Sequence, residues 1–402
     1  MRNFLYECYP YGLNEMFVEY EMQAFEDLDE EFNIWVLRPG DKSKMRYIPK
    51  NAMVNFIEGE TLSVKFLGFM RLFKKNSLCE IFKVLKRKHK EGMLRCLNRI
   101  YRYQKVAVLF EKQYKNSKCG NSDVFVSYWL NECAFALVEL KKKYPNIKIA
   151  SRGHGYDVFE ERCYLPFRRD ILSGLDKIYL INKASKEYFN DHYSKWLDVS
   201  KIEISHLGVN IPQNVTPKDN GTFKVVTCSS VIPLKRLDLI IDALANLKEK
   251  NIEWVHFGGG SLFEKMKQYA AEKLEGGNLK YEFKGQVPLN DVHEFYKTTS
   301  VNLFVNCSDT EGTPVSVMEA MSYGIPSVAR NVGGMAEVLD ENCGILLPKE
   351  ESIEQLKDAI ERFYVMNSEE YVIYSKNARQ KIENEFDAKR VFKEYINTIY
   401  SL

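Results

Sequence analysis

The strongest constraint on the fold is a repeated alternation of short apolar runs with longer segments of helical period. Each run is rich in β-branched and aromatic residues, which is typical of strands buried on both faces of a parallel sheet. The runs form two series: residues 3–6, 32–37, 124–128, 147–150, 177–181 and 202–205, and then residues 223–228, 253–257, 281–283, 301–305, 326–329 and 344–347. The pattern predicts an α/β protein with two doubly wound parallel sheets of Rossmann-like type.

The length of the chain also favours two domains. A chain of 402 residues exceeds what a single hydrophobic core usually fills. Prolines, amides and a glycine gather in residues 210–221 without helical period, so we expect an N-terminal domain of residues 1–215 and a C-terminal domain of residues 216–402. The last segment, residues 387–402, has a candidate N-cap at Asp387 and apolar residues at helical spacing. We expect this final helix to pack back on the N-terminal domain.

Charge and cysteine usage narrow the cellular setting. The net charge of +2 gives no reason to expect a nucleic-acid partner. The nine cysteines are scattered without a Cys-x-x-Cys pair, which favours a reducing, cytoplasmic compartment. Glu7 interrupts the region where a signal peptide would be apolar, and no long uncharged apolar run follows. We expect no membrane span, while peripheral contact with the inner face of the cytoplasmic membrane stays open.

Residues 61–120 are strongly basic, with 16 Lys and Arg against three Glu. Apolar residues recur there at near-helical spacing, at Ile81, Leu85, Met93, Leu97 and Tyr101. Such a helix has an apolar side opposite its cations. Two interpretations remain open: a helix that rests on an anionic membrane surface, or a core-packed helix with a solvated basic face.

The most specific stretch is residues 306–326, where an apolar run is followed by a loop of small and acidic residues. Thr313 is a candidate N-cap and Pro314 fits a first helical turn, while Gly324 is expected to stop the helix. A helix therefore begins at the carboxyl end of a parallel strand. Its N–H groups and positive dipole end suit a phosphate group.

Two carboxylates belong to this segment, Glu311 in the loop and Glu319 about two turns inside the helix. A carboxylate beside a bound diphosphate is unfavourable unless it accepts hydrogen bonds from hydroxyl groups, which a sugar and a ribose supply. The alternative is that Glu311 is a solvated loop charge and Glu319 an ordinary surface residue.

A second element, residues 227–236, follows the first strand of the C-terminal domain and opens an amphipathic helix. Ser230 lies in the turn, and Lys235 with Arg236 would neutralise a diphosphate and the charge that develops as it leaves. A solvated cationic helix start is the alternative. Glycines at 258–260 fit a tight turn after the next strand.

Two loops of the N-terminal domain carry further candidates. His154 lies between glycines after the run at 147–150, which predicts a place at the carboxyl edge of the sheet, facing the cleft. A structural imidazole in a tight turn is the alternative. Gly12 follows the first run, and a turn glycine explains it almost equally well.

With these motifs the chain resembles the bacterial group 1 (family 4) glycosyltransferases, retaining enzymes of GT-B fold whose two Rossmann-like domains face a central cleft. The resemblance rests on the Glu-x7-Glu element, the strand before it and the Gly-Ile-Pro after it, and it covers residues 223–348 best. Enzymes of capsule, exopolysaccharide and lipopolysaccharide synthesis are the most similar in pattern.

The resemblance implies roles for individual residues. Glu311 contacts the transferred sugar, Glu319 binds the ribose hydroxyls, and His154 lies near the donor sugar. The backbone around the phosphates and the sugar comes from Gly12, Gly312, Thr313, Pro314 and Val315. The chain departs from the family at Ser229-Ser230, where a Gly-Arg dipeptide is usual, and at Arg236, where a glycine is usual. Arg236 is expected to substitute for the missing arginine.

The expected reaction is retaining transfer of a hexosyl or N-acetylhexosaminyl group from a nucleotide diphosphate sugar, with UDP taken from family habit, to a hydroxyl of a saccharide or lipid-linked acceptor. No second carboxylate is clearly placed to act as a nucleophile, which favours same-face attack. No Asp-x-Asp element or His/Cys cluster stands at a phosphate site, so neither a metal nor another cofactor is expected. The alternatives are a sugar-nucleotide epimerase and a catalytically silent, donor-binding partner subunit.

Overall fold

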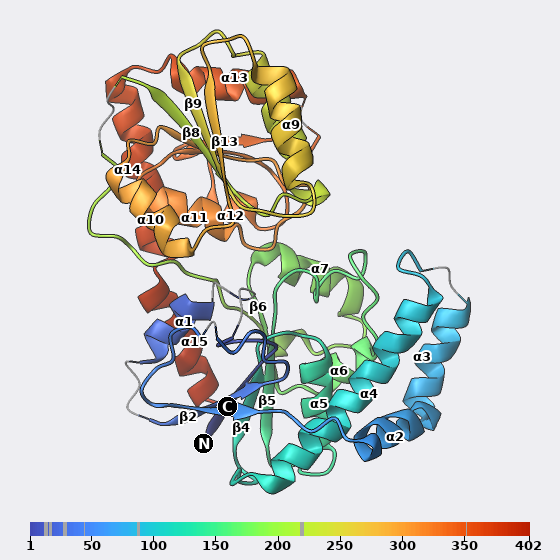
Figure 1. Cartoon of the computed structure of the whole chain (residues 1–402). Coiled ribbons are helices and arrows are strands. Elements are labelled where there is room, and N and C mark those ends of the chain that lie inside the picture. The colour runs from blue at the N-terminus through green and yellow to red at the C-terminus, as the bar shows by residue number, and fades with distance from the viewer. Residues whose placement is uncertain are drawn as a thin grey trace. The chain divides into compact units, whose positions relative to one another are not determined.

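The computed structural model describes residues 1–11, 15, 18–26, 30–43, 45–86, 89–217, 221–350 and 352–402. It divides into two compact units (Figure 1): Met1–His206 with Phe392–Leu402, and Leu207–Val391. The chain therefore enters the second unit earlier than the composition of residues 210–221 suggests. The reason is that Val209 is already bonded inside that unit, since its N–H donates to Phe386 and its carbonyl accepts from Ala388, both at 3.0 Å.

The described part of the first unit contains a seven-stranded parallel sheet of order β3-β2-β1-β4-β5-β6-β7. Its strands are β1 (Arg2–Tyr6), β2 (Phe32–Val36), β3 (Ala52–Phe56), β4 (Val124–Ser127), β5 (Lys148–Gly153), β6 (Lys177–Leu180) and β7 (Ile202–Ile204). Six of them match the predicted runs. The edge strand β3 was missed because its side chains are half-buried or exposed and include the polar Asn55, which donates to Asn33 of β2 at 2.9 Å.

Helices cover both faces of this sheet. They are α1 (Val18–Phe25), α2 (Leu62–Met70), α3 (Lys75–Lys86), α4 (Met93–Asn116), α5 (Glu132–Lys141), α6 (Arg168–Gly174), α7 (Lys183–Tyr193) and α15 (Ala388–Tyr400), with 3-10 turns η1 (Arg71–Phe73) and η2 (Val199–Lys201). Alternate residues of one strand enter different cores, as the two-residue period of a strand requires: Leu5 packs with α4 and α5, and Phe4 packs with α1 and α15.

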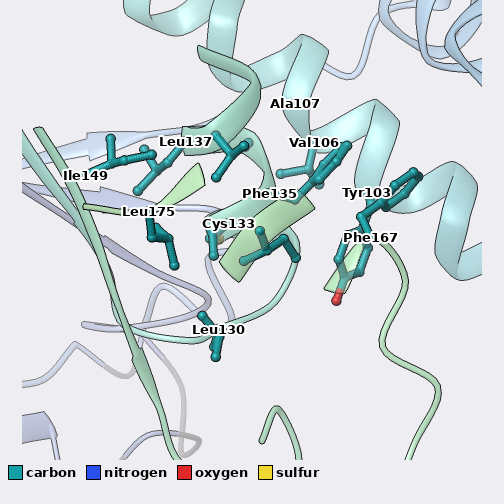
Figure 2. Close-up of a cluster of buried hydrophobic side chains, with 14 of the residues drawn as sticks. Tyr103, Val106, Ala107, Leu130, Cys133, Phe135, Leu137, Ile149, Phe167 and Leu175 are labelled. Atoms are coloured by element: carbon teal, nitrogen blue, oxygen red, sulfur yellow. The ribbon is translucent and has the colours of Figure 1, made fainter. Parts of the chain in front are cut away.

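The first of these cores contains closely packed aromatic rings. Figure 2 shows side chains of α4 and α5 meeting Ile149 of β5 and the segment at Phe167. The rings of Phe135 and Phe167 are stacked with centroids 4.3 Å apart, and Tyr103 of α4 lies 5.9 Å from Phe135. Such ring pairs contribute about 1 kcal/mol each beyond the burial of their area. They join α5 to α4 and to the start of α6 (Arg168–Gly174).

The apolar stripe expected through residues 81–101 is wrong as a single helix. Helix α3 ends at Lys86 and α4 begins at Met93 after Gly92, whose φ of 84° breaks the helical path. Ile81 and Leu97 pack against the core as expected, whereas Leu85 and Met93 are exposed.

The last helix joins the core of the first unit. Asp387 accepts a hydrogen bond from the Lys389 N–H at 3.2 Å, and the apolar residues Tyr395, Ile396 and Ile399 are buried with β1, β2 and α1. Figure 1 shows α15 beside α1. The guanidinium of Arg152, which is buried and pairs with Glu21 at 2.8 Å, lies 4.5 Å above the Tyr395 ring.

The second unit contains, in its described residues, a six-stranded parallel sheet of order β10-β9-β8-β11-β12-β13. The strands are β8 (Phe223–Cys228), β9 (Ile252–Phe257), β10 (Lys280–Gly285), β11 (Leu303–Asn306), β12 (Ser327–Arg330) and β13 (Gly344–Leu347). The helices are α8 (Leu237–Ala245), α9 (Phe263–Leu274), α10 (Leu289–Thr298), α11 (Val315–Ser322), α12 (Met335–Val338), α13 (Ile353–Tyr364) and α14 (Ser368–Glu385), with the 3-10 turn η3 (Pro233–Lys235). All six predicted runs of the second series are strands.

Both sheets reverse their strand order at a single point. The reversal lies between β1 and β4 in the first sheet and between β8 and β11 in the second. In open α/β sheets ligands bind at the carboxyl ends of the strands beside such a point. A ligand site in the second unit is therefore expected at the loops after β8 and β11. In the first unit it is expected at the loops after β1 and β4.

Candidate functional site

The turn after β8 packs directly against the loop after β9. The loop after β9 lies so close to this turn that a Cβ at Gly258, whose φ is 133°, would lie 1.9 Å from the Ser229 carbonyl oxygen. The Val231 N–H donates to Gly259 at 2.8 Å. The glycines of this loop are needed for that close approach. Ser230 is exposed in the turn, and Lys235 and Arg236 are half-buried at its end.

The loop after β11 leads into α11, which begins at Val315. The predicted N-cap at Thr313 is wrong by one residue, because Pro314 has a non-helical ψ of 74° and its carbonyl accepts the first helical bonds, from Val317 and Met318. The predicted stop is confirmed, since Gly324 has a left-handed φ of 74° directly after the helix. The start of α11 thus faces the carboxyl edge of the sheet.

A second loop supports the backbone of residues 311–312. The loop after β12 lies so close that a Cβ at Gly333 would be 1.9 Å from the Glu311 carbonyl oxygen. The Gly334 N–H donates to the Gly312 carbonyl at 2.9 Å. The loop after β12 therefore supports the backbone of Glu311 and Gly312. The side chains of Thr313 and Val315, like Gly312, are half-buried.

Lys235 and Glu311 meet across the reversal point. The Lys235 ammonium lies 2.6 Å from Glu311 Oε1, which also accepts from the Asn306 side chain at 3.2 Å. The backbone ties the same loops together, because the Asp309 N–H donates to Leu234 at 2.8 Å. Two residues that are far apart in the sequence and that were predicted separately are thus brought into contact.

Arg236 belongs to a network of acids and bases. Its guanidinium lies 3.1 Å from Asp238 and 3.4 Å from Asp309, and Arg330 at the end of β12 lies 2.6 Å from the same Asp309 oxygen. The hydrogen bond to Asp238 raises the pKa of Arg236. Sequence reasoning missed Asp309 and Arg330. A signal existed for Arg330, since a cation directly ends an apolar strand at the carboxyl edge.

The backbone of Arg236 is left-handed, with φ 47° and ψ 46°. An ordinary residue pays about 1–2 kcal/mol for this conformation, whereas glycine adopts it freely. The departure from the family pattern at this position therefore places a strained residue where a glycine is usual. The same residue forms the ion pairs with Asp238 and Asp309.

Glu319 is a buried residue of α11 with 5% of its surface exposed, so the interpretation as an ordinary surface residue is wrong. It lies close enough to Cys228, the last residue of β8, to affect its ionisation: burial and then the Glu319 charge raise the pKa of Cys228 to about 12. The same two causes, with Cys228, raise the pKa of Tyr296. Glu319 of α11 thus lies beside the end of β8, at the strand reversal of the second sheet.

His154 follows β5 in the first unit and is buried with 5% exposure. Its ring packs against those of Tyr128 and Trp129, at centroid distances of 4.5 and 4.4 Å. Burial, followed by the charge of Arg152, lowers the pKa of His154 well below its usual value. The imidazole is therefore neutral and can exchange hydrogen bonds without carrying charge.

Asp157 organises the loop around His154. Its carboxylate accepts from the backbone N–H groups of Leu130, His154 and Gly155 at 2.8, 2.8 and 3.1 Å. These bonds join the loop after β4 to the loop after β5. Asp157 was not predicted, although an aspartate three residues after a histidine that lies between glycines is a signal that the sequence carries.

Two more acids stand at this edge of the first sheet. Glu15 accepts from the N–H groups of Cys8 and Tyr9, at 2.9 and 2.7 Å, and from the Trp129 indole. Glu7 directly follows β1, and burial raises its pKa. Gly12, which was predicted as a donor-binding glycine, lies outside the described residues.

Within the described ranges, no group of three or more His, Cys, Asp or Glu side chains is arranged to hold a metal ion. Among the same residues, no helix has both the length and the apolar character that crossing a membrane requires.

Comparison with known proteins identifies the second unit. Residues 211–381 match the family model for glycosyl transferases group 1. A putative colanic acid biosynthesis glycosyltransferase of Escherichia coli K12 is 25% identical over 216 residues, which is 50% of this chain and 52% of the relative. The matched region thus spans about half the length of that relative.

Solved structures are similar over the whole chain. A lipopolysaccharide outer core galactosyltransferase has a TM-score of 0.71 at 18% identity, covering 100% of this chain and 99% of its own. An Anabaena protein solved with UDP and glucose has a TM-score of 0.68 at 13% identity, with the same coverage. At these identities the similarity shows the fold, which is the predicted GT-B fold of two Rossmann-like units.

Proposed function

We propose that this chain, which carries a glycosyl transferases group 1 domain at residues 211–381, is a retaining glycosyltransferase that uses a nucleotide diphosphate sugar. The observation that carries the proposal is the contact between Lys235 and Glu311 at the strand reversal of the second sheet. A cation for a diphosphate and a carboxylate for sugar hydroxyls then stand together at the carboxyl edge, beside the start of α11.

The diphosphate is bound in this proposal by three kinds of positive group. The first-turn N–H groups of α11 and its positive dipole end are directed toward the loop after β11. Lys235 and Arg236 supply full charges, and Ser230 supplies a hydroxyl from the turn after β8. A lysine ammonium has three donors, so Lys235 can bind phosphate while it remains bonded to Glu311.

The sugar and the ribose are bound by the two carboxylates. Glu311 accepts hydrogen bonds from the transferred sugar, with the backbone of Gly312, Thr313, Pro314 and Val315 around it. Glu319, buried beside the end of β8, binds the ribose hydroxyls. The position of Glu319 supports this role, because ligands of open α/β sheets bind at the carboxyl ends of the strands beside the reversal, where β8 ends.

The chemical step in this proposal is same-face attack. The bond between the anomeric carbon and the β-phosphate oxygen breaks, the acceptor oxygen bonds to the same face of the sugar, and its proton passes to the departing diphosphate. Lys235 and Arg236 stabilise the negative charge on the leaving group. His154, which is neutral, serves in this proposal as a hydrogen-bonding group that orients a hydroxyl and not as a cation.

We propose UDP as the nucleotide and a saccharide or lipid-linked saccharide as the acceptor. The UDP in the similar Anabaena structure supports the first choice. The colanic acid and outer core relatives support the second, since both are named for polysaccharides of the cell surface. Hexosyl and N-acetylhexosaminyl groups both fit a site that recognises hydroxyls through Glu311.

The test is incubation of the purified chain with radiolabelled UDP-glucose, UDP-galactose and UDP-N-acetylglucosamine, with and without saccharide acceptors. We expect release of UDP and transfer of label to the acceptor with retained anomeric configuration, read by nuclear magnetic resonance. Conversion of the sugar without UDP release would identify an epimerase. Binding of the donor without any turnover would identify a silent partner subunit, and either result would reject the transferase.

A further inference from the structure

Helix α2 and the turn η1 expose a continuous apolar stripe. The stripe consists of Leu62, Phe66, Phe69 and Phe73, which are 85%, 62%, 51% and 61% exposed. Their spacing of four, three and four residues places them on one side of successive helical turns. The opposite side of α2 packs on α4 so closely that a Cβ at Gly68 would lie 3.0 Å from the Lys105 Cα. The apolar stripe is therefore held outward by the packing of the helix.

Helix α3 also exposes large apolar side chains, and it turns polar side chains toward the core. Its outer side carries Leu78, Phe82 and Leu85, which are 38%, 60% and 56% exposed. Two of its three buried residues are polar: Ser77 accepts from Gln104 of α4 at 2.9 Å, and Glu80 accepts from Tyr164 at 2.6 Å. A helix on the surface of a protein that meets only water turns its apolar side inward. Here the polar groups are bonded to the unit and the large apolar groups face out.

Cations without partners surround these apolar side chains. Lys65 lies on α2, Lys75 and Lys86 lie on α3, Lys90 lies between α3 and α4, and Arg95 lies in the first turn of α4, and all five are exposed. Within the described part of the chain none of the five takes part in a salt bridge, whereas neighbours such as Lys83 and Lys105 do. Unpaired cations interleaved with exposed phenylalanines are unusual on a surface that only meets solvent.

We propose that α2, η1 and α3 form a docking surface for an anionic lipid bilayer. Phe66, Phe69, Phe73, Phe82 and Leu85 enter the boundary between headgroups and acyl chains, and the unpaired cations bind the lipid phosphates. A protein partner fits less well, because lysine is depleted in the buried centre of protein interfaces and charged residues there need partners. This surface uses none of the residues proposed to bind the donor. Membrane docking and glycosyl transfer can therefore be tested independently.

The experiment is flotation of the full chain with vesicles at low salt. Vesicles of pure phosphatidylcholine are compared with an equimolar mixture of phosphatidylcholine and phosphatidylglycerol. We expect strong binding to the anionic vesicles only, and the double variant Phe66→Ser with Phe82→Ser should lower the partition coefficient roughly tenfold or more. Replacing Lys75, Lys86 and Lys90 by glutamine should also weaken binding, by a factor that shrinks as salt is added.

The matched control replaces Val372 and Ile373 by serine. These residues of α14 are 57% and 59% exposed but lie in the second unit, so this variant should float like the unmodified chain. Equal flotation of the Phe66→Ser with Phe82→Ser variant would overturn docking, as would equal binding to the neutral vesicles. Self-association that this variant abolishes, without vesicle binding, would also overturn it and identify a subunit interface. Loss of UDP binding with flotation intact would instead reject the proposed function.

Discussion

Lys235 and Glu311 form an ion pair of 2.6 Å that joins the loop after β8 to the loop after β11. Both side chains are largely buried, with 20% and 12% of their surfaces exposed. An ion pair in such a setting stays formed only if both partners keep their charge and position. The pair therefore orients each group for its proposed task, the ammonium toward a phosphate and the carboxylate toward a sugar.

The first prediction concerns this pair. Lys235→Ala and Glu311→Ala should each lower kcat by roughly 10²–10³-fold, as the loss of one group that stabilises a transition state does. The double variant should lose much less than the product of the two factors, because each group depends on the other. UDP release under saturating donor measures all three. Lys284→Ala is the control, since it removes a more exposed pair of nearly the same length, 2.7 Å, with Glu282 on β10. Additive losses would contradict the coupling.

The second prediction separates Glu319 from Glu311. Glu319→Gln keeps the shape of the buried side chain but removes its charge, so binding of UDP should weaken roughly tenfold or more, as for a lost hydrogen bond to a charged group. The turnover at saturating donor should change little. Titration calorimetry with UDP gives the affinity, and Glu311→Gln provides the contrasting case with affinity kept and turnover lost. Unchanged UDP affinity in Glu319→Gln would remove its ribose-binding role.

Sequence periodicity was sufficient for the second sheet but not for the whole first one. Strands such as β8 are buried on both faces, so their composition alone marks them. The edge strand β3 is half-exposed and mixes polar with apolar residues, so no periodicity identified it. The same limit applied to α3, where spacing indicated an amphipathic helix but could not tell which side faced the core.

The sequence predicted individual residues of the site but not the contacts between them. Lys235 and Glu311 were each identified from their motifs, but their contact depends on the strand order, which places β11 next to β8. Asp309 follows β11 and Arg330 ends β12, and the two meet because β11 and β12 are neighbouring strands. The left-handed backbone of Arg236 also has no sequence signal, because it replaces the glycine that would have marked it.

The third prediction follows from that backbone. Arg236→Gly and Arg236→Ala both remove the guanidinium and its partially exposed ion pairs, but only the glycine relieves the left-handed strain. Arg236→Gly should therefore unfold at a free energy about 1 kcal/mol higher than Arg236→Ala, as measured by urea denaturation. Both variants should lose turnover to a similar degree, because both lack the cation. An alanine variant as stable as the glycine variant would contradict the strain.

The fourth prediction concerns His154. His154→Ala should lower turnover by roughly tenfold or more while the affinity for UDP stays the same, because the neutral imidazole is proposed to orient a hydroxyl and not to bind phosphate. The pH profile of kcat should show no step near pH 6.5 from this residue, since burial holds its pKa well below that value. His192→Ala is the control in the same unit, an exposed histidine stacked on Tyr188. Unchanged turnover would leave His154 a structural imidazole.

The fifth prediction links pH to stability through His256. This buried imidazole is bonded to Thr227 at 2.8 Å, and burial lowers its pKa to about 4. Below about pH 6.5 the unfolded chain binds a proton there that the folded chain does not, so this group makes stability fall as pH decreases through that range. The difference between the unmodified chain and His256→Asn should therefore shrink by about 1.6 kcal/mol from pH 6.5 to pH 5. Urea unfolding at both pH values measures it. A difference that stays constant, or that grows as pH falls, would show that His256 is protonated in the folded chain.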